Sequence, residues 1–219
     1  MKNYSAIIFD LDGTLTDPGE GIVNSVRYAL KKFHINEIDT KKLLKFIGPP
    51  LNKSFEKYYN FSSEKAKQSV DYYREYYADR GIWENHLYPG IKEILHYLTS
   101  KNCSLFVGTS KPTVYAKQIL QRYEIDHYFA DIVGSNLDLT RVSKTEIIEY
   151  ILKQHALIQV EDILMVGDTH YDIRGASTVG IDSLHVGYGY GDFREVEKYN
   201  PTYSIKEITE LNSFFGVQS

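Results

Sequence analysis

Short apolar runs alternate with segments of helical spacing over the second half of the chain. The runs expected to form strands there are residues 104–108, 132–134, 163–166 and 183–186. The segments with helical spacing around them are residues 89–98, 113–122, 145–155 and 172–179. Because parallel strands need a crossover connection, strands joined by helices predict βαβ units. A further apolar run, residues 6–9, begins the pattern. We therefore predict an α/β fold with a doubly wound, Rossmann-like parallel sheet and helices on both of its faces.

Residues 17–85 interrupt this alternation and contain no convincing strand. The helices expected there, from the spacing of apolar side chains, are residues 19–33, 40–46, 51–59 and 64–80. We therefore expect a core formed by residues 1–16 and 86–219, with an α-helical domain, residues 17–85, inserted into it. A short strand and a helix should close the core near its C-terminal end.

The composition limits the classes of partner. The chain of 219 residues is 42% hydrophobic and 25% charged, which is ordinary for a globular protein with a sizeable core. A net charge of -4 without a basic cluster argues against a nucleic-acid polymer or an anionic membrane as partner. No apolar run approaches the roughly 20 residues that span a bilayer, and the first strand begins too early for a signal peptide. With one cysteine, Cys103, expected to be a buried and inert thiol, we predict a cytoplasmic protein.

Nineteen tyrosines are present, and six of them are grouped within the inserted segment at residues 58–59, 72–73 and 76–77. Such a group can form a binding wall or a partner surface. Spacing near 3.6 residues is, however, the usual signal of a helix face that packs against its neighbours. We expect these rings to be half-buried packing residues. A monomer and a homodimer are both compatible with this pattern.

Two carboxylates separated by one residue follow the first apolar run. Asp10 and Asp12 come where the strand is expected to end, and Gly13 and Thr14 then bend the chain. Because side chains alternate along a strand, the two aspartates start on the same side. Like charges this close resist joint ionisation unless a cation or a proton intervenes. The pair suits metal binding combined with nucleophilic and acid–base chemistry, although Asp-x-Asp at a strand end is also a common turn or cap.

Polar side chains also follow two other expected strands. Thr109, Ser110 and Lys111 come after one of them, and Asp168 after another. Open parallel sheets bind ligands at the carboxyl ends of their strands, so these side chains should meet the two aspartates in one crevice. Taken singly, Thr109 and Asp168 could be helix caps. Their convergence on one edge of the sheet favours a functional site.

A phosphate monoester would find the groups it needs in that crevice. Asp10 is the candidate nucleophile, because a carboxylate can attack phosphorus and form an aspartyl phosphate. Asp12 would protonate the leaving oxygen and later deprotonate the attacking water. Asp168 would complete a magnesium site with Asp10 and the main-chain carbonyl of Asp12, since Mg²⁺ prefers oxygen ligands.

Other side chains are candidates for binding the phosphate. Thr109 and Ser110 offer donors at a strand end, followed by N–H groups that lead into a helix. Lys144, at the start of a helix, would offset charge on the phosphoryl group, although a lone lysine there is usually solvated. Lys111 is a second candidate for the cation, and Asp172 could hold a metal-bound water. His170 and Arg141 are candidates for a contact with the substrate.

Together these residues resemble the signature motifs of the haloacid dehalogenase (HAD) superfamily of phosphatases. The four motifs are, in chain order, residues 10–16 (DLDGTLT), Thr109, Lys144 and residues 167–172 (GDTHYD). The resemblance spans nearly the whole chain and implies a magnesium-dependent phosphatase. It also implies a helical cap that closes over the site and selects the substrate, with hinge strands near residues 16–17 and 83–88.

Two further segments are similar to one branch of that superfamily. Residues 46–51 (FIGPPL) and 109–112 (TSKP) resemble phosphoglycolate-phosphatase-like and 5′-nucleotidase-like members. The substrate implied is a small phosphorylated metabolite, such as phosphoglycolate, a nucleoside 5′-monophosphate or a sugar phosphate. Fold likeness does not select among these.

Other functions share part of this pattern. A C–halogen hydrolase needs neither the second carboxylate nor a metal, so Asp12, Asp168 and Asp172 count against it. A signalling receiver domain lacks a helical insertion after its first strand. A phosphomutase of the same superfamily carries all four motifs and stays an alternative, as does a non-catalytic, phospho-binding regulatory protein that has kept the site.

Overall fold

The computed structural model describes residues 2–138, 140–156 and 160–217. The chain divides into two compact units, one formed by Met1–Thr16 with Leu87–Ser219 and the other by Asp17–His86. The strands β2 (Thr16–Asp17) and β3 (His86–Leu87) contain both points at which the chain passes between the units, and they pair with each other.

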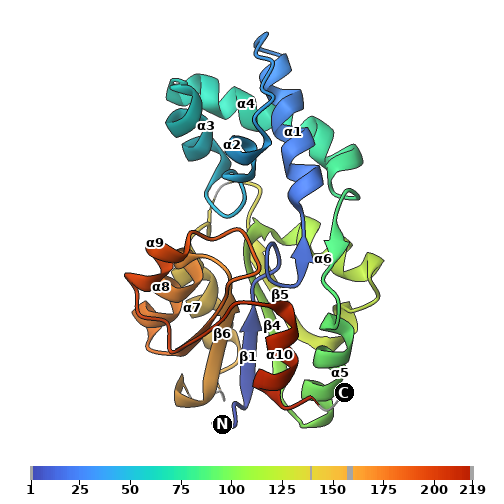
Figure 1. Ribbon diagram of the computed structural model, residues 1–219, viewed down its shortest axis with the longest axis vertical. Coiled ribbons are helices and arrows are strands. Elements are labelled where there is room, and N and C mark those ends of the chain that lie inside the picture. The colour runs from blue at the N-terminus through green and yellow to red at the C-terminus, as the bar shows by residue number, and fades with distance from the viewer. Residues whose placement is uncertain (1, 139, 157–159, 218–219) are drawn as a thin grey trace. The chain divides into compact units, whose positions relative to one another are not determined.

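A six-stranded parallel sheet forms the centre of the first unit (Figure 1). In spatial order its strands are β5 (Phe129–Ser135), β4 (Ser104–Pro112), β1 (Ala6–Phe9), β6 (Ile163–Gly167), β7 (Asp182–Val186) and β8 (Tyr203–Ile205). The chain runs outward from β1 to β4 and β5, and it then returns to the other side of β1. Doubly wound sheets bind ligands beside such a reversal, at the carboxyl ends of the strands.

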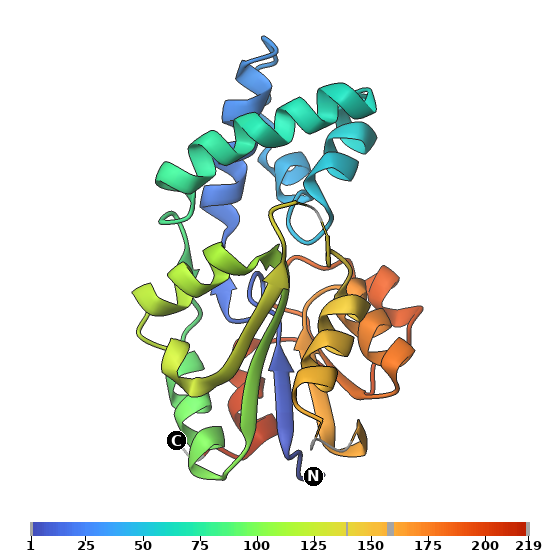
Figure 2. The ribbon, with the colours of Figure 1, turned by 180° about the vertical axis from the view of Figure 1, so that it is seen from behind.

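Helices cover both faces of this sheet, which confirms the predicted fold class (Figures 1 and 2). They are α5 (Ile91–Ser100), α6 (Thr113–Arg122), α7 (Lys144–Gln154), α8 (His170–Val179), α9 (Phe193–Glu197) and α10 (Ile208–Phe215), with the 3₁₀ turns η2 (Asp126–Tyr128) and η3 (Val160–Asp162). Buried residues of α7 and α8 share one cluster with Ile8, Phe106 and Met165 of the strands. On the other face, the ring of Phe215 in α10 contacts that of Phe9. Burial on both faces explains why these strands are continuous apolar runs.

The second unit is helical, and aromatic rings fill its interior. Its elements are α1 (Gly19–Lys31), α2 (Thr40–Leu44), α3 (Leu51–Tyr59), α4 (Ser63–Tyr76) and the π-helical turn η1 (Tyr77–Gly81). Phe46 packs edge-on against Phe55 with ring centroids 5.0 Å apart, and Phe33 packs against Phe61 at 5.3 Å. This packing accounts for the apolar spacing of the inserted segment.

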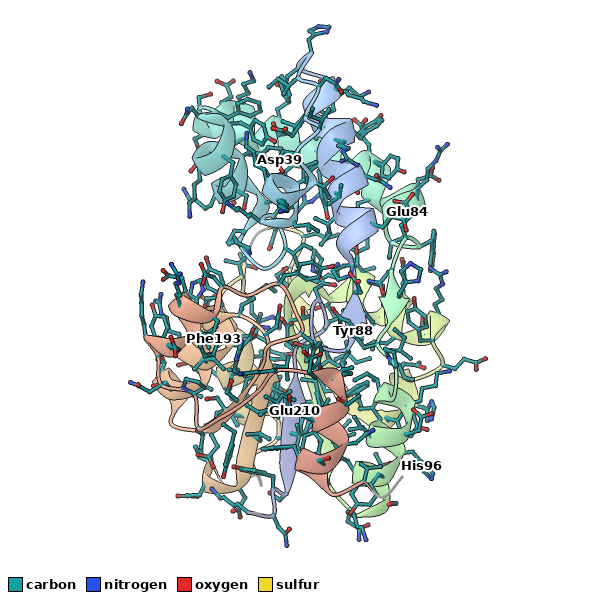
Figure 3. All side chains as sticks on the ribbon, viewed as in Figure 1. Asp39, Glu84, Tyr88, His96, Phe193 and Glu210 are labelled. Atoms are coloured by element: carbon teal, nitrogen blue, oxygen red, sulfur yellow. The ribbon has the colours of Figure 1, made fainter. Side chains whose placement is uncertain are left out.

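The six grouped tyrosines are buried or half-buried, as predicted. The rings of Tyr73 and Tyr77 stack at 5.4 Å inside the helical unit. The Tyr76 hydroxyl donates to Glu84, which is labelled in Figure 3 and also accepts from the Asn24 amide. These rings therefore contribute packing and internal hydrogen bonds to this unit.

Some elements differ from the expected pattern. The helix expected over residues 64–80 ends as an α-helix at Tyr76 and continues as η1. Helix α8 begins at His170, two residues earlier than expected, because Thr169 and Asp172 form a capping box. Helix α9 was not expected, since five residues are too few to establish a helical period.

Candidate active site

Strand β1 brings Asp10 to the carboxyl edge of the sheet, beside β6. The Asp10 N–H donates to the Val166 carbonyl at 2.8 Å, and the residue is 7% exposed. The chain then folds back tightly, because the N–H groups of residues 14–16 all donate to the Leu11 carbonyl. Gly13 adopts φ 80°, a conformation that only glycine adopts without strain. This turn holds Asp12 next to the end of β1.

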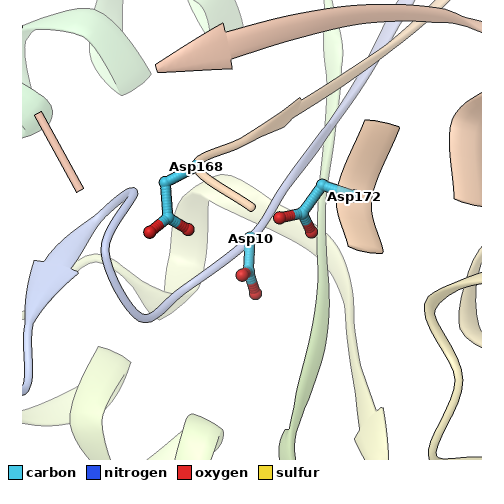
Figure 4. Close-up of side chains that lie close together, drawn as sticks. All are labelled: Asp10, Asp168 and Asp172. Carbon is cyan, nitrogen blue, oxygen red and sulfur yellow. The ribbon is translucent and has the colours of Figure 1, made fainter. Parts of the chain in front are cut away.

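Three buried carboxylates face one another at this edge of the sheet (Figure 4). Asp10, Asp168 and Asp172 each have an oxygen within 4.8 Å of the others. Asp168 follows β6, and Asp172 lies in the first turn of α8. Asp172 also has partners of its own, since its Oδ2 accepts from the N–H and the hydroxyl of Thr169, at 3.0 and 2.7 Å.

Lys144 links two of these carboxylates from the start of α7. Its ammonium group lies 2.9 Å from Asp10, 2.8 Å from Asp172 and 2.7 Å from the Gly108 carbonyl. Burial alone would lower the pKa of Lys144, but Asp10 and Asp172 raise it above its usual range. The lysine is therefore a fixed, buried positive charge beside Asp10.

A second buried lysine pairs with the other aspartate of the first motif. The Lys111 ammonium group lies 2.8 Å from Asp12 Oδ2, and only 5% of its side chain is exposed. Thr109, directly after the apolar part of β4, is buried and accepts the Lys111 N–H at 3.2 Å. Ser110 is half-buried, and its carbonyl accepts the Ser135 hydroxyl. The two lysines thus form ion pairs with different aspartates: Lys111 with Asp12, and Lys144 with Asp10 and Asp172.

The net negative charge of this cluster and its buried carboxylate oxygens without hydrogen bonds within the described ranges fit a divalent cation. Four carboxylates meet two ammonium groups, so two negative charges are left for a cation to balance. Asp168 Oδ1 and Asp12 Oδ1 are buried without a hydrogen-bond partner among the described residues. Burial raises the pKa of Asp10 to about 6, and burial with the neighbouring aspartates raises the pKa of Asp168 well above its usual range. A hard cation with oxygen ligands, such as Mg²⁺, would relieve both effects.

The loop after β7, Gly187-Tyr188-Gly189-Tyr190-Gly191, also belongs to the site, although sequence reasoning missed it. The Tyr190 N–H donates to Asp168 Oδ2 at 2.7 Å. A Cβ at Gly189 would lie 2.3 Å from the Asp168 side chain, and one at Gly191 would lie 1.9 Å from the Asp168 carbonyl. Three glycines in five residues directly after a strand were the available signal, because they indicate close approach of the backbone to another group.

Three other residues singled out in the sequence are engaged elsewhere. The ring of His170 lies against those of Tyr171 and Tyr199. Arg141 donates to the Gly134 carbonyl and lies over the ring of Tyr150. Cys103 is buried, and burial raises the pKa of its thiol to about 11, which agrees with the expected inert thiol.

The raised carboxyl pKa values predict how stability depends on pH and metal. An aspartate whose pKa in the folded protein is raised above the usual 3.8 contributes stability that is fully present below about pH 3.8. For Asp10 this contribution is lost as the pH rises through its folded-state pKa of about 6. We expect the Tm of the metal-free protein to fall between about pH 5 and pH 7.5, and added Mg²⁺ to raise Tm more at the higher pH. The effect should be on the order of a few kcal/mol. Thermal unfolding with Mg²⁺ or EDTA measures it, and an Asp168→Asn variant should show a smaller effect. A metal-free Tm that rises over this pH range would contradict the prediction.

Comparisons with known proteins agree with this geometry. Residues 7–186 match the sequence model of a family described as haloacid dehalogenase-like hydrolase. A 5′-nucleotidase of Pseudomonas aeruginosa is 42% identical over 208 residues, which cover 95% of this chain and 94% of that protein. The tyrosine-protein kinase PtkA of Mycobacterium tuberculosis is 35% identical over 96% of this chain and 72% of its own length. The crystal structure of a predicted phosphatase from Clostridium acetobutylicum is similar with a TM-score of 0.92 and 41% identity, covering 99% of this chain and 100% of that one.

None of the helices in the described part of the chain has the length and apolar character of a membrane-spanning segment.

Proposed function

This chain belongs to the haloacid dehalogenase-like hydrolases and is a phosphatase of that family, and we propose that it hydrolyses small phosphomonoesters with Mg²⁺ through an aspartyl phosphate on Asp10. The observation that carries the proposal is the environment of Asp10. It is a buried carboxylate at the end of the central strand, 2.9 Å from the Lys144 ammonium group and beside Asp168. Such a carboxylate is oriented and charge-balanced for attack on phosphorus.

The proposed reaction has two steps. Asp10 attacks phosphorus, the bond from phosphorus to the leaving oxygen breaks, and a protonated Asp12 gives its proton to that oxygen. In the second step, Asp12 takes a proton from a water molecule that attacks the phosphorus of the aspartyl phosphate. The bond between phosphorus and Asp10 then breaks, and inorganic phosphate and the free carboxylate are restored. Asp12 lies two residues beyond the nucleophile, and it contacts the Lys111 ammonium group, whereas Asp10 contacts that of Lys144.

The metal and phosphate contacts follow from the same residues. Asp10, Asp168 and the main-chain carbonyl of Asp12 would hold Mg²⁺, which when bound neutralises charge on the phosphoryl group. Thr109 and Ser110, in the C-terminal half of β4, would donate to phosphate oxygens. Lys144 would stabilise the negative charge beside Asp10 in both steps.

The substrates to test come from the relatives and the motifs. The similarity to the 5′-nucleotidase of P. aeruginosa supports a nucleoside 5′-monophosphate. 2-Phosphoglycolate and a sugar phosphate complete the panel, because the branch that the motifs resemble includes them. Release of inorganic phosphate, measured as kcat/KM with Mg²⁺ and with EDTA, ranks these substrates.

Rapid acid quench with ³²P-labelled substrate tests the mechanism. We expect a transient label on Asp10 and turnover that stops on chelation of Mg²⁺. Many turnovers without a phosphorylated activator exclude a phosphomutase cycle, whereas the absence of any turnover would favour a non-catalytic phospho-binding protein. Turnover with no label on Asp10 would refute the covalent route.

Asp12→Ala should slow both steps. The variant lacks the acid for the leaving oxygen and the base for water, so each rate should fall by about 100- to 10,000-fold. Single-turnover quench measures the formation and the decay of the phosphoenzyme separately. A variant that changes only KM would contradict the acid–base assignment.

A further inference from the structure

We propose that Tyr188 is a positioning residue that holds the turn carrying Asp12 in place relative to Asp168. The inference rests on the proposed function, in which Asp12 is the acid and the base. Tyr188 lies in the glycine-rich loop after β7, far along the chain from the first motif. Its hydroxyl donates to the main-chain carbonyl of Thr14 at 2.9 Å.

The turn after β1 needs support from outside itself. Its internal main-chain hydrogen bonds end on the carbonyls of Leu11 and Thr16. Two successive carbonyls between those residues accept from other segments: Thr14 from the Tyr188 hydroxyl, and Leu15 from the Tyr88 N–H at 3.0 Å. The rings of Tyr88 and Tyr188 meet edge-on at 5.0 Å (Tyr88 is labelled in Figure 3). A turn held at two adjacent carbonyls has little freedom to rotate the preceding Asp12.

The same loop is fixed to Asp168. The Tyr190 N–H binds the Asp168 carboxylate, and Gly189 packs so closely that an added Cβ would lie 2.3 Å from Asp168 and 2.5 Å from the Gly13 carbonyl. One five-residue loop therefore contacts both the metal-ligand candidate and the turn beyond the nucleophile. The side chain of Tyr188 reaches the turn through its hydroxyl.

The Tyr188 hydroxyl is suited to be a permanent donor. Burial raises the pKa of Tyr188 above its usual range, so the phenol stays protonated. Thr14 is fully buried, and a carbonyl that loses its donor in such a place carries an unmet desolvation penalty. Removal of the hydroxyl should therefore shift the turn while leaving the ring contact with Tyr88 in place.

Tyr188→Phe tests the proposal with two kinds of substrate. An alkyl phosphate, adenosine 5′-monophosphate or 2-phosphoglycolate, needs a proton on its leaving oxygen, whereas p-nitrophenyl phosphate does not. Because kcat/KM reports the first step alone, misplacement of Asp12 should lower it about tenfold for the alkyl phosphate and less than about threefold for the aryl phosphate. Mg²⁺ affinity, measured by calorimetry, should fall by clearly less than the alkyl-phosphate kcat/KM, since the Tyr190 N–H still binds Asp168 and only one proposed ligand, the Asp12 carbonyl, lies in the turn.

Tyr150→Phe is the matched control. It removes the same hydroxyl from a tyrosine that is 38% exposed on α7, and both kcat/KM values should stay at the wild-type level. Equal losses for alkyl and aryl phosphates in Tyr188→Phe, or a parallel loss of Mg²⁺ affinity, would overturn the positioning role. Unchanged values for both substrates would overturn it too. If the wild-type protein cleaves none of these phosphomonoesters, the proposed function itself fails, which is a separate result.

Discussion

Replacing Asp10 with asparagine is expected to lower kcat by more than about 1,000-fold and to abolish the acid-stable label. An amide of nearly the same shape cannot attack phosphorus, so no aspartyl phosphate forms. Lys144 keeps Asp172 and the Gly108 carbonyl as partners, and the fold should therefore persist. Initial rates of phosphate release and rapid-quench labelling measure the effect, and the Tm verifies folding.

The control for this substitution is Asp71→Asn, the same chemical change at an exposed position of α4. Its rates and labelling should equal those of the wild type. Asp10→Asn could instead retain substantial turnover and a label at another residue. That outcome would show that the carboxylate next to Lys144 is not the nucleophile.

The second large effect is expected from Gly13→Ala, with Gly180→Ala as its matched control. Both glycines have nearly the same positive φ, 80° and 78°, so alanine strains both by about 1 kcal/mol. Only the Cβ at position 13 meets the site, because it would lie 2.3 Å from Asp168 Oδ2, whereas nothing lies within 4 Å of the Cβ at position 180. Displacement of a metal-ligand candidate by about 1 Å should cost about 100-fold in kcat/KM.

The two variants separate local strain from damage to the site. We expect both variants to lose Tm, Gly13→Ala more because Asp168 must also move, and we expect kcat/KM and Mg²⁺ affinity to fall only in Gly13→Ala. Thermal unfolding, calorimetry with Mg²⁺ and steady-state kinetics measure the three quantities. Equal activity in the two variants would show that the contact between residue 13 and Asp168 does not matter for function.

The order of strands and helices in the core follows from local patterns. Runs such as residues 6–9 and 163–166 are buried on both faces of the sheet, and they are therefore apolar at every position. The start of one helix was set instead by hydrogen bonds to a side chain. Helix α8 begins early because of the contact between Thr169 and Asp172, which no apolar period reports.

Partnerships within the site were harder to predict. Lys144 was expected to be a phosphate-binding cation, and the structure shows which groups it holds, namely Asp10, Asp172 and the Gly108 carbonyl. Asp172 was expected to support a metal-bound water, and it accepts from Thr169. The contact of Tyr188 with the turn after β1 joins residues 174 positions apart. No local pattern contains such a pair.

The amino-acid order alone thus determined which segments become strands and helices, and that acids, hydroxyls and lysines lie at strand ends. Those properties depend on the period of apolar side chains and on the chemistry of neighbouring residues. Only the tertiary structure decided which lysine meets which aspartate, and which loop encloses Asp168. Distances between separate elements depend on strand register and on the paths of the connections, which no single segment of the chain encodes.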